Sequence, residues 1–304
     1  MLFIISIISF IAVHLAPNSF FASGELNPNI TQESIDQLKA IYNLDKPLYI
    51  QFTSWLINIL HLDFGISFSS GEQVKIEILN RLPITLILNI TTIIFVFFIS
   101  LYLGITSAMK PNSFIDKVTK QLSILSFSLP SFYLALILLF IFSITFEVFP
   151  LSGVTSSNDL DGFAYIKDLA WHLFLPITVM VFGGIGSLTL YIRSLTLEIL
   201  KSDYIFFAKS RGLSGYQLLR YFILPNLYPT IITILGLSLP GILGGSVILE
   251  NIFAIDGMGL LFFQSALSHD YPVIMGILII GAFLTLLGNI LADIILLKVN
   301  PHMK

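Results

Sequence analysis

Apolar residues in this chain form long, nearly uninterrupted runs, and polar residues gather between them. A helix that crosses a bilayer needs roughly 20 mostly apolar residues. Five runs reach that length, at about 83–107, 122–146, 172–197, 227–249 and 272–297. A sixth run, residues 2–16, is apolar but short. The pattern predicts an all-α integral membrane protein of about six transmembrane helices.

The short first run, within residues 1–16, raises the alternative of a signal peptide. It has no basic start and no clear cleavage site of small residues, so we predict a first transmembrane helix instead. The run also lacks the cytoplasmic Lys or Arg that usually anchors such a helix. That absence is what a truncated N-terminus would produce, with the true start upstream of Met1.

Composition indicates a surface that faces lipid. Only 11% of the residues are charged, and the mean hydropathy is +0.91. Soluble domains are about 25% charged, so these charges could not cover a water-facing surface. The net charge of −3 gives no basic footprint for nucleic acid. Without cysteine, the chain has no disulfide and no thiolate metal ligand.

Basic residues are distributed unequally across the predicted membrane. If the N-terminus is cytoplasmic, those at the inner side are Lys110, Lys117, Lys120, Arg193, Lys201, Lys209, Arg211, Arg220, Lys298 and Lys304. Those outside are Lys39, Lys46, Lys75, Arg81 and Lys167. Because Lys and Arg favour the cytoplasmic side, we predict that both termini are cytoplasmic.

The predicted outer segment, residues 17–82, is too long to be a simple turn. It contains an amphipathic pattern near 31–43, ended by Pro47, and a second apolar stretch from Trp55 to Leu60. No Gly/Ser-rich linker, charge block or internal repeat divides the chain. We therefore predict one membrane domain with a first helix at 1–16, an extracytoplasmic segment at 17–82 and a five-helix core at 83–304.

The most informative loop is the predicted inner one at 198–226, between the fourth and fifth helices. Its pattern predicts two short helices. One face of the first would carry Tyr204, Phe207, Ala208 and Arg211. Gly212 and Gly215 would form the turn, because glycine adopts positive φ without a Cβ clash. Pro225 suits the first turn of the next membrane helix. An ordinary amphipathic connector would also give this pattern.

The same loop resembles the inner loop of binding-protein-dependent ABC importer permeases, whose pattern is E-A-A, three residues, G, nine residues, I-x-L-P. The matching positions are Ala208, Gly212, Leu224 and Pro225. The departing positions are Phe206, Phe207 and Phe222, in place of Glu, Ala and Ile. The Glu is often absent in the peptide and nickel branch of this family.

In that family the loop is a coupling helix that sits in a groove of a cytoplasmic ATPase. An aromatic and aliphatic face suits such a groove, and Lys209 and Arg211 can pair with acidic residues at its rim. The resemblance implies a coupling function for Tyr204, Phe207, Ala208, Lys209, Arg211, Gly212, Leu224 and Pro225.

Further blocks resemble the peptide/nickel branch and follow its order. They are 44–50 (LDKPLYI), 61–68 (HLDFGISF), 81–86 (RLPITL), 128–132 (SLPSF), 249–253 (LENIF), 256–259 (DGMG) and 270–274 (DYPVI). Each block alone is a common pattern, but their order over roughly 40–275 is specific. The resemblance implies the type I ABC importer permease fold in a bacterial cytoplasmic membrane.

The resemblance also implies partners: a second homologous permease, two cytoplasmic ATPases and an extracytoplasmic binding protein. The chain has no G-x-x-x-x-G-K-[ST] loop, no G-x-S-x-G elbow and no H-E-x-x-H. We therefore expect no enzyme and no bound cofactor here, with ATP and Mg²⁺ on the partner subunits.

The run at 55–68 especially resembles nickel permeases, although dipeptide permeases share most blocks. Nickel, as a chelate handed over by the binding protein, is the favoured cargo, and dipeptides or oligopeptides are the alternative. The histidines show no metal-ligand spacing such as i, i+4; they are His14, His61, His172, His269 and His302. A permease need not coordinate a metal that its binding protein captures.

An ion-coupled carrier and a membrane scaffold are the remaining alternatives. A carrier would be expected to place an acidic residue near the bilayer midplane, and no predicted span has one. Arg193 and Asp293 lie near inner ends, where we expect Arg193 to snorkel and Asp293 to pair with a nearby Lys or Arg.

Small residues cluster in the fourth and fifth predicted helices. They are Gly183, Gly184, Gly186 and Ser187 in one, and Gly241, Gly244 and Gly245 after Pro240 in the other. Such residues allow helices to approach closely, so helix packing and pore lining are both open. In a permease, these helices would form the dimer seam, with Gly241, Gly244 and Gly245 near the path.

Overall fold

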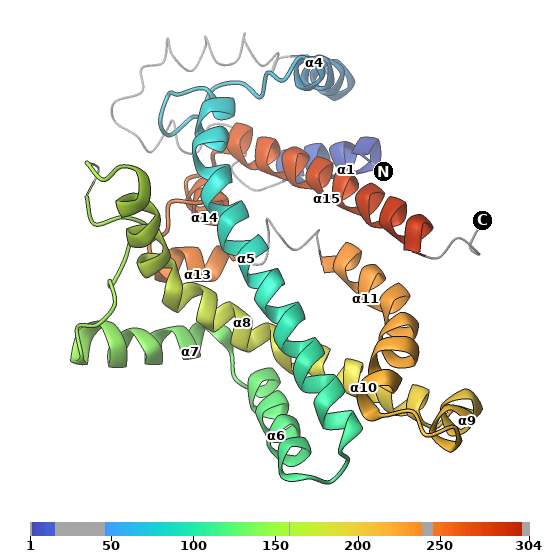
Figure 1. Cartoon of the computed structure of the whole chain (residues 1–304). Helices are drawn as coiled ribbons and strands as arrows, with labels where there is room; N and C mark the ends of the chain where they lie inside the picture. The colour runs from blue at the N-terminus through green and yellow to red at the C-terminus, as the bar shows by residue number, and fades with distance from the viewer. Residues whose placement is uncertain (1, 16–45, 158, 239–245, 300–304) are drawn as a thin grey trace.

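The structure is a computed structural model that describes residues 2–15, 46–157, 159–238 and 246–299. Helices make up most of the described chain (Figure 1), in the order α1 (Leu2–Leu15), α4 (Leu48–Leu60), α5 (Val74–Met109), α6 (Phe114–Ser128), α7 (Ser131–Leu138), the π-helix η1 (Leu139–Thr145), α8 (Gly162–Leu200), α9 (Asp203–Ser210), α10 (Gly215–Leu218), the π-helix η2 (Leu219–Ile223), α11 (Leu224–Ser238), α13 (Val247–Ile252), α14 (Met258–Leu267) and α15 (Tyr271–Val299). Within these ranges, extended pairing is limited to one isolated bridge between Ile66 and Gln73.

By length and composition, four stretches of the described chain can cross a membrane: Val74–Met109, Gly162–Leu200, Gly215–Gly236 and Tyr271–Ile295. At 1.5 Å per residue, α5 and α8 are about 54 and about 58 Å long, nearly twice a hydrocarbon core of roughly 30 Å. Both therefore extend past the membrane. Residues 74–82, which were predicted as part of the outer segment, form the first turns of α5 and belong to the part of this helix that extends past the membrane.

The predicted span at 122–146 is not one straight helix. α6 and the helix formed by α7 and η1 meet at an angle of 99°. The break falls at Leu129 and Pro130, because the residue before a proline is disfavoured in the α region. Leu129 is accordingly extended, with φ −85° and ψ 124°. The bent pair is a fifth span at most.

The predicted span at 227–249 begins earlier than expected. α10, η2 and α11 form one helical stretch, so the second short helix predicted in the inner loop is the start of this longer one. Pro225 lies inside it, where proline cannot donate to the carbonyl four residues back. The π-helical turn of η2 ends at Ile223, two residues before Pro225, and adapts the backbone to the proline.

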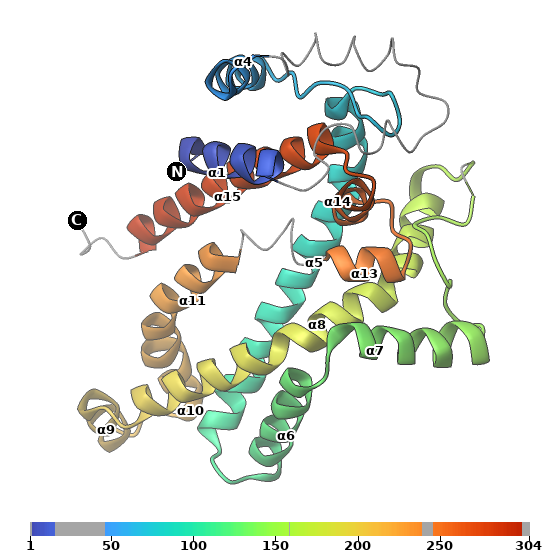
Figure 2. The same cartoon turned by 180° about the vertical axis from the view of Figure 1, so that it is seen from behind.

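The first helix, α1, has 14 residues and is therefore about 21 Å long. It lies along α15 (Figure 2). Phe10 packs edge-on against Phe52 of α4, with ring centroids 5.3 Å apart, and also contacts Trp55. The prediction of about six spans thus becomes four long helices, a bent pair and one short helix. The amphipathic helix predicted near 31–43 lies outside the described residues.

α5 and α8 share the longest helix–helix interface of the described chain. Glycine permits their close approach: a Cβ on Gly104 would lie 2.8 Å from Ile192 Cγ2, and one on Gly184 would lie 2.8 Å from Val96 Cγ2. Two other helices continue this framework, because α6 packs on α8 and α11 runs along α15. The long α5–α8 pair therefore connects the loop at α9 with the cavity described below, because α8 leads into α9 and both helices line the cavity.

Candidate functional site

The predicted coupling loop is an ordered helix–turn–helix. α9 ends at Ser210, and the turn that follows depends on Gly212, which has φ +80°. α10 begins with a capping box, in which Ser214 and Gln217 each bind the other's backbone N–H. Gly215 has no positive φ in the described backbone, so the prediction that it forms the turn is wrong; it is the first residue of α10.

The small side chain of Ala208 faces inward. Ala208 and Ile205 are buried against Leu218 of α10, with Phe222 packed beside them. The predicted shared face is therefore wrong for Ala208: it joins α9 to α10, whereas Tyr204, Phe207 and Arg211 are exposed. The reason is the turn at Gly212, which folds α10 onto the Ile205 side of α9 and leaves the other side open.

The exposed side of α9, here called the α9 surface, consists of Tyr204, Phe206, Phe207, Lys209 and Arg211. Phe206 and Phe207 are 69% and 65% exposed. Adjacent aromatic rings between basic groups form a surface suited to an apolar groove with an acidic rim. Two of the three residues that depart from the family pattern, Phe206 and Phe207, therefore supply the most exposed apolar side chains of the α9 surface.

The other predicted coupling residues lie at the base of the loop. Leu224 packs in a cluster with Ile105 of α5 and Ile192 of α8. Pro225 is exposed on the same helical stretch. These contacts anchor the loop to the α5–α8 pair.

A buried ion pair joins α6 to α8 near the end of α8 that leads into the loop. Asp116 of α6 is fully buried, and Arg193 of α8 holds it with two hydrogen bonds, Nε to Oδ1 at 2.7 Å and Nη2 to Oδ2 at 3.1 Å. Lys120 Nζ is 3.2 Å from Oδ2, and the hydroxyl of Ser107 donates to Oδ1. Arg193 therefore does not snorkel as predicted but ties α8 to the α5–α6 hairpin. Asp293 is exposed, and within the described ranges it forms no ion pair.

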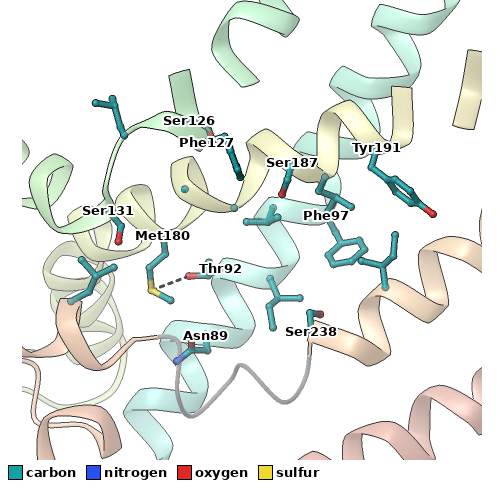
Figure 3. A pocket seen from close by; sticks show the side chains of 18 residues that line it. Asn89, Thr92, Phe97, Ser126, Phe127, Ser131, Met180, Ser187, Tyr191 and Ser238 are labelled. Carbon is teal, nitrogen blue, oxygen red and sulfur yellow. Dashed lines mark hydrogen bonds between the residues drawn. The ribbon is translucent and has the colours of Figure 1, made fainter. Parts of the chain in front are cut away.

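A cavity of about 870 Å³ opens among α5, α6, α8 and α11 (Figure 3). Its polar lining side chains are all neutral: Asn89, Thr92, Ser126, Ser131, Ser187, Tyr191 and Ser238. The rest of its wall is aliphatic or aromatic apart from Met180 and two glycines. Such a lining can hold a hydrated organic solute, and its described residues offer no charged ligand to a bare cation.

The glycines of α8 have different roles. A Cβ on Gly186 would lie 2.6 Å from the backbone oxygen of Ser123, so Gly186 packs α8 against α6. A Cβ on Gly183 would meet nothing within 4 Å, and Gly183 and Ser187 line the cavity. Helix packing and cavity lining thus both occur within one turn. The predicted pore residues Gly241, Gly244 and Gly245 lie outside the described residues.

Three of the sequence blocks meet in one buried polar joint. Glu250 (block 249–253) accepts hydrogen bonds from the hydroxyl of Thr85 (block 81–86) and from the amides of Gly259 and Leu260 at the start of α14. A carboxylate is well placed at the N-terminus of a helix. A Cβ on Gly257 would lie 2.5 Å from Glu250 Oε2. The D-G-M-G block therefore has a glycine at the position where the Glu250 carboxylate packs against the backbone.

A second joint explains two further blocks. Asp270 (block 270–274) is fully buried, and its Oδ2 accepts from Ser67 Oγ at 2.6 Å (block 61–68) and from the amide and hydroxyl of Ser69. Nearby, Arg81 Nε binds Asp256 Oδ1 at 2.7 Å. Blocks far apart in sequence therefore resemble the family together because they contact one another.

The sequence did not identify the cavity residues Asn89 and Thr92. Asn89 is an amide inside a predicted span, a signal that could have been noticed. Two of the histidines bind within their own helical segments: His61 contacts the carbonyl of Ile57, and His172 that of Asp168. In the part of the chain that the structure describes, no three His, Asp or Glu side chains form a metal site.

Comparison with known proteins assigns the chain to a family. The model of the binding-protein-dependent transport system inner membrane component matches residues 100–304, and that of the N-terminal part of such membrane components matches residues 1–89. The oligopeptide transport system permease protein AppB of Bacillus subtilis (strain 168) is 36% identical over 301 residues, covering 99% of this chain and 94% of the relative.

A nickel import relative is similarly close. The nickel import system permease protein NikB of Staphylococcus aureus (strain MRSA252) is 33% identical over 307 residues, covering 100% of this chain and 88% of the relative. Among solved structures, the MetNI methionine ABC transporter in inward facing conformations has a chain that matches with a TM-score of 0.57 at 17% identity, covering 73% of this chain and 95% of that one. This likeness shows the fold. The chain therefore belongs to the binding-protein-dependent ABC importer permeases of the peptide/nickel branch.

Proposed function

We propose that this permease passes a small organic solute, either a short peptide or nickel held in a chelate, through the cavity among α5, α6, α8 and α11. The observation that carries the proposal is the neutral, hydroxyl-rich wall of that cavity. Hydroxyl and amide groups can exchange hydrogen bonds with a passing solute without holding it tightly. A bare Ni²⁺ ion prefers imidazole nitrogen, and none of the described residues of this wall supplies it.

Nickel and peptides both remain candidates within this proposal. The run at 55–68 favours nickel, as does the 33% identical nickel import relative. The 36% identical relative is an oligopeptide permease. A chelate is also an organic solute of similar polarity, so one cavity suits either cargo.

Uptake in a strain that lacks the importer's own genes separates the cargoes. Radioactive nickel, with and without histidine as chelator, is compared with a radiolabelled dipeptide. We expect uptake of one of these cargoes, and nickel uptake only when the chelator is present. Uptake of nickel without any chelator, in chelator-free medium, would contradict the organic-solute proposal.

A blocking variant tests the path itself. Ser187→Trp places an indole where the cavity wall is now an exposed hydroxyl. We expect it to abolish uptake of every cargo while leaving the protein in the membrane. The control is Phe163→Trp, an aromatic exchange at an 81% exposed site at the first turn of α8. Normal uptake by Ser187→Trp would show that cargo takes another route.

We further propose that the permease pairs with a second homologous permease, two cytoplasmic ATPases and an extracytoplasmic binding protein. In this arrangement both termini are cytoplasmic, and the ATPases hold ATP and Mg²⁺. The α9 surface supports the proposal, because its exposed aromatic rings and basic groups suit an ATPase groove. ATPase closure would then move α8 and α11 as near-rigid bodies.

Co-purification with the ATPases tests this docking. Burial of one phenylalanine stabilises a contact by about 1.5–3 kcal/mol, so Phe207→Ser should weaken ATPase binding about tenfold or more. Phe163→Ser, an equally polar change at an exposed site far along α8, should have no effect. Ala208 is a poorer probe, since a larger side chain there would disturb α9 and α10 themselves. Equal ATPase recovery with both phenylalanine variants would contradict docking at the α9 surface.

A further inference from the structure

The hydrogen bonds of the buried joint at Glu250 all run in one direction, from donors toward the carboxylate. Glu250 Oε1 accepts from the hydroxyls of Thr85 and Ser246, at 3.0 and 2.7 Å, and Oε2 accepts from two backbone amides of α14. All four hydrogen bonds are donated to the carboxylate, which therefore acts only as an acceptor. The hydroxyl hydrogen of Ser246 is committed to Glu250. Ser246 can then only accept from its next neighbour.

That next neighbour is Asn89 of α5. Asn89 Nδ2 lies 3.0 Å from Ser246 Oγ and 2.9 Å from the carbonyl oxygen of Thr85. Both partners are acceptors, so both hydrogens of the Asn89 amide group point into the joint. The amide cannot turn around without placing its oxygen against two other oxygens. Its orientation is therefore fixed by hydrogen bonds that lead back to the α14 N-terminus.

The fixed amide lies at the cavity wall. Asn89 is only 4% exposed, yet it lines the cavity beside Thr92 (Figure 3). With both amide hydrogens used, the group left to the cavity is the acceptor Oδ1. Within the described residues, no hydrogen bond is donated to this oxygen. Thr92 behaves differently, because its hydroxyl donates to its own helix at the carbonyl of Leu88, 2.8 Å away.

We propose that Asn89 is a specificity-determining residue that offers a fixed hydrogen-bond acceptor to the cargo, and that Ser246 is the positioning residue that orients it. The cargo class is then one rich in N–H donors: the ammonium and amide groups of a short peptide, or the metal-bound amines of an amino-acid chelate. The proposal rests on the proposed function of the cavity as the path. It favours these solutes over carboxylate-only or N-blocked ones.

The test uses cargo pairs that differ in N–H donors. One pair is a radiolabelled dipeptide and its N-acetylated form; the other is radioactive nickel with histidine and with citrate. The importer is assayed with the same binding protein throughout, so the selectivity of that protein cancels when variants are compared. The measured quantity is the uptake ratio of the donor-rich to the donor-poor member of the pair.

Three variants are compared with the wild type. Asn89→Leu keeps the size of the side chain but removes the acceptor, and we expect the ratio to fall about tenfold, the effect of one hydrogen bond to a charged donor. Ser246→Ala removes one of the two acceptors that hold the Asn89 amide hydrogens, so the amide orientation is less fixed and the ratio should fall, although Ser246 does not line the cavity. Thr106→Val removes a hydroxyl elsewhere on α5 that bonds the carbonyl of Tyr102 and does not line the cavity, so the ratio should stay unchanged.

The outcomes separate this proposal from the function on which it rests. A ratio that stays at the wild-type value in both Asn89→Leu and Ser246→Ala would overturn it, even if total uptake falls, because a purely structural role lowers both cargoes equally. A ratio that falls in Thr106→Val to the same extent would also overturn it. If Ser187→Trp passes cargo normally, the cavity is not the path, and the proposed function fails first.

Discussion

At the scale of single residues, Gly186 determines how closely α8 and α6 pack. Gly186→Ala would bring a Cβ within 2.6 Å of a backbone oxygen that cannot move aside. Overpacking of this kind costs about 1–3 kcal/mol, so thermal denaturation in detergent should occur at a lower temperature. Gly183→Ala, on the same helix, meets nothing within 4 Å and should leave the midpoint unchanged or raise it slightly. Equal midpoints for the two variants would contradict this distinction.

The same residues show the limit of sequence-based prediction. The cluster of small residues in the fourth predicted helix indicated close packing or a path, and both occur. Which glycine does which depends on how α8 is rotated against its neighbours, and no local pattern encodes that rotation. Ala208 is a similar case. The sequence pattern predicts that Ala208 shares a face with Tyr204, Phe207 and Arg211, whereas the structure buries it against α10.

At the scale of elements, the capping box of α10 holds the predicted coupling loop in shape. Ser214→Ala removes the side-chain acceptor for the amide of Gln217, a loss of about 0.5–2 kcal/mol. We expect faster hydrogen exchange at 213–218 and less cargo carried per ATP hydrolysed. Ser210→Ala is the matched control, since that hydroxyl only bonds the carbonyl of Phe206 on its own exposed helix. Similar exchange in both variants would show that the cap does not order the loop.

Sequence predicts a membrane helix well where apolar length alone determines its course. It predicts poorly where a proline changes the direction or hydrogen bonding of the backbone. The runs at 83–107, 172–197 and 272–297 all lie within long helices of the structure. The runs at 122–146 and 227–249 each predict a single uninterrupted transmembrane helix. In the first, Pro130 turns the chain by 99°; in the second, η2 lets the helix continue through Pro225. Hydropathy detects apolar length but not the direction of the backbone.

At the scale of the whole molecule, the ordered blocks were informative because they form joints. The sequence showed them as separate patterns along the chain. The structure brings Thr85, Glu250 and Gly257 together in one joint and Ser67 with Asp270 in another. The two carboxylates in these joints, Glu250 and Asp270, are both fully buried and accept hydrogen bonds from other segments of the chain. A buried carboxylate also joins two helices at the other end of the molecule, near α9.

There, the Asp116–Arg193 pair links α6 to α8 near the end of α8 that leads into α9, so a push on α9 should move both helices together. Breaking a buried pair costs about 3–5 kcal/mol because one charge is left uncompensated. Asp116→Asn and Arg193→Gln should therefore each lower the thermal midpoint and the cargo carried per ATP. The double variant should lose less than the sum of the two, since neither charge is stranded, with a coupling of about 0.5–3 kcal/mol. Strictly additive losses in a double-mutant cycle would mean that the two side chains act separately and that α6 and α8 are joined by packing alone.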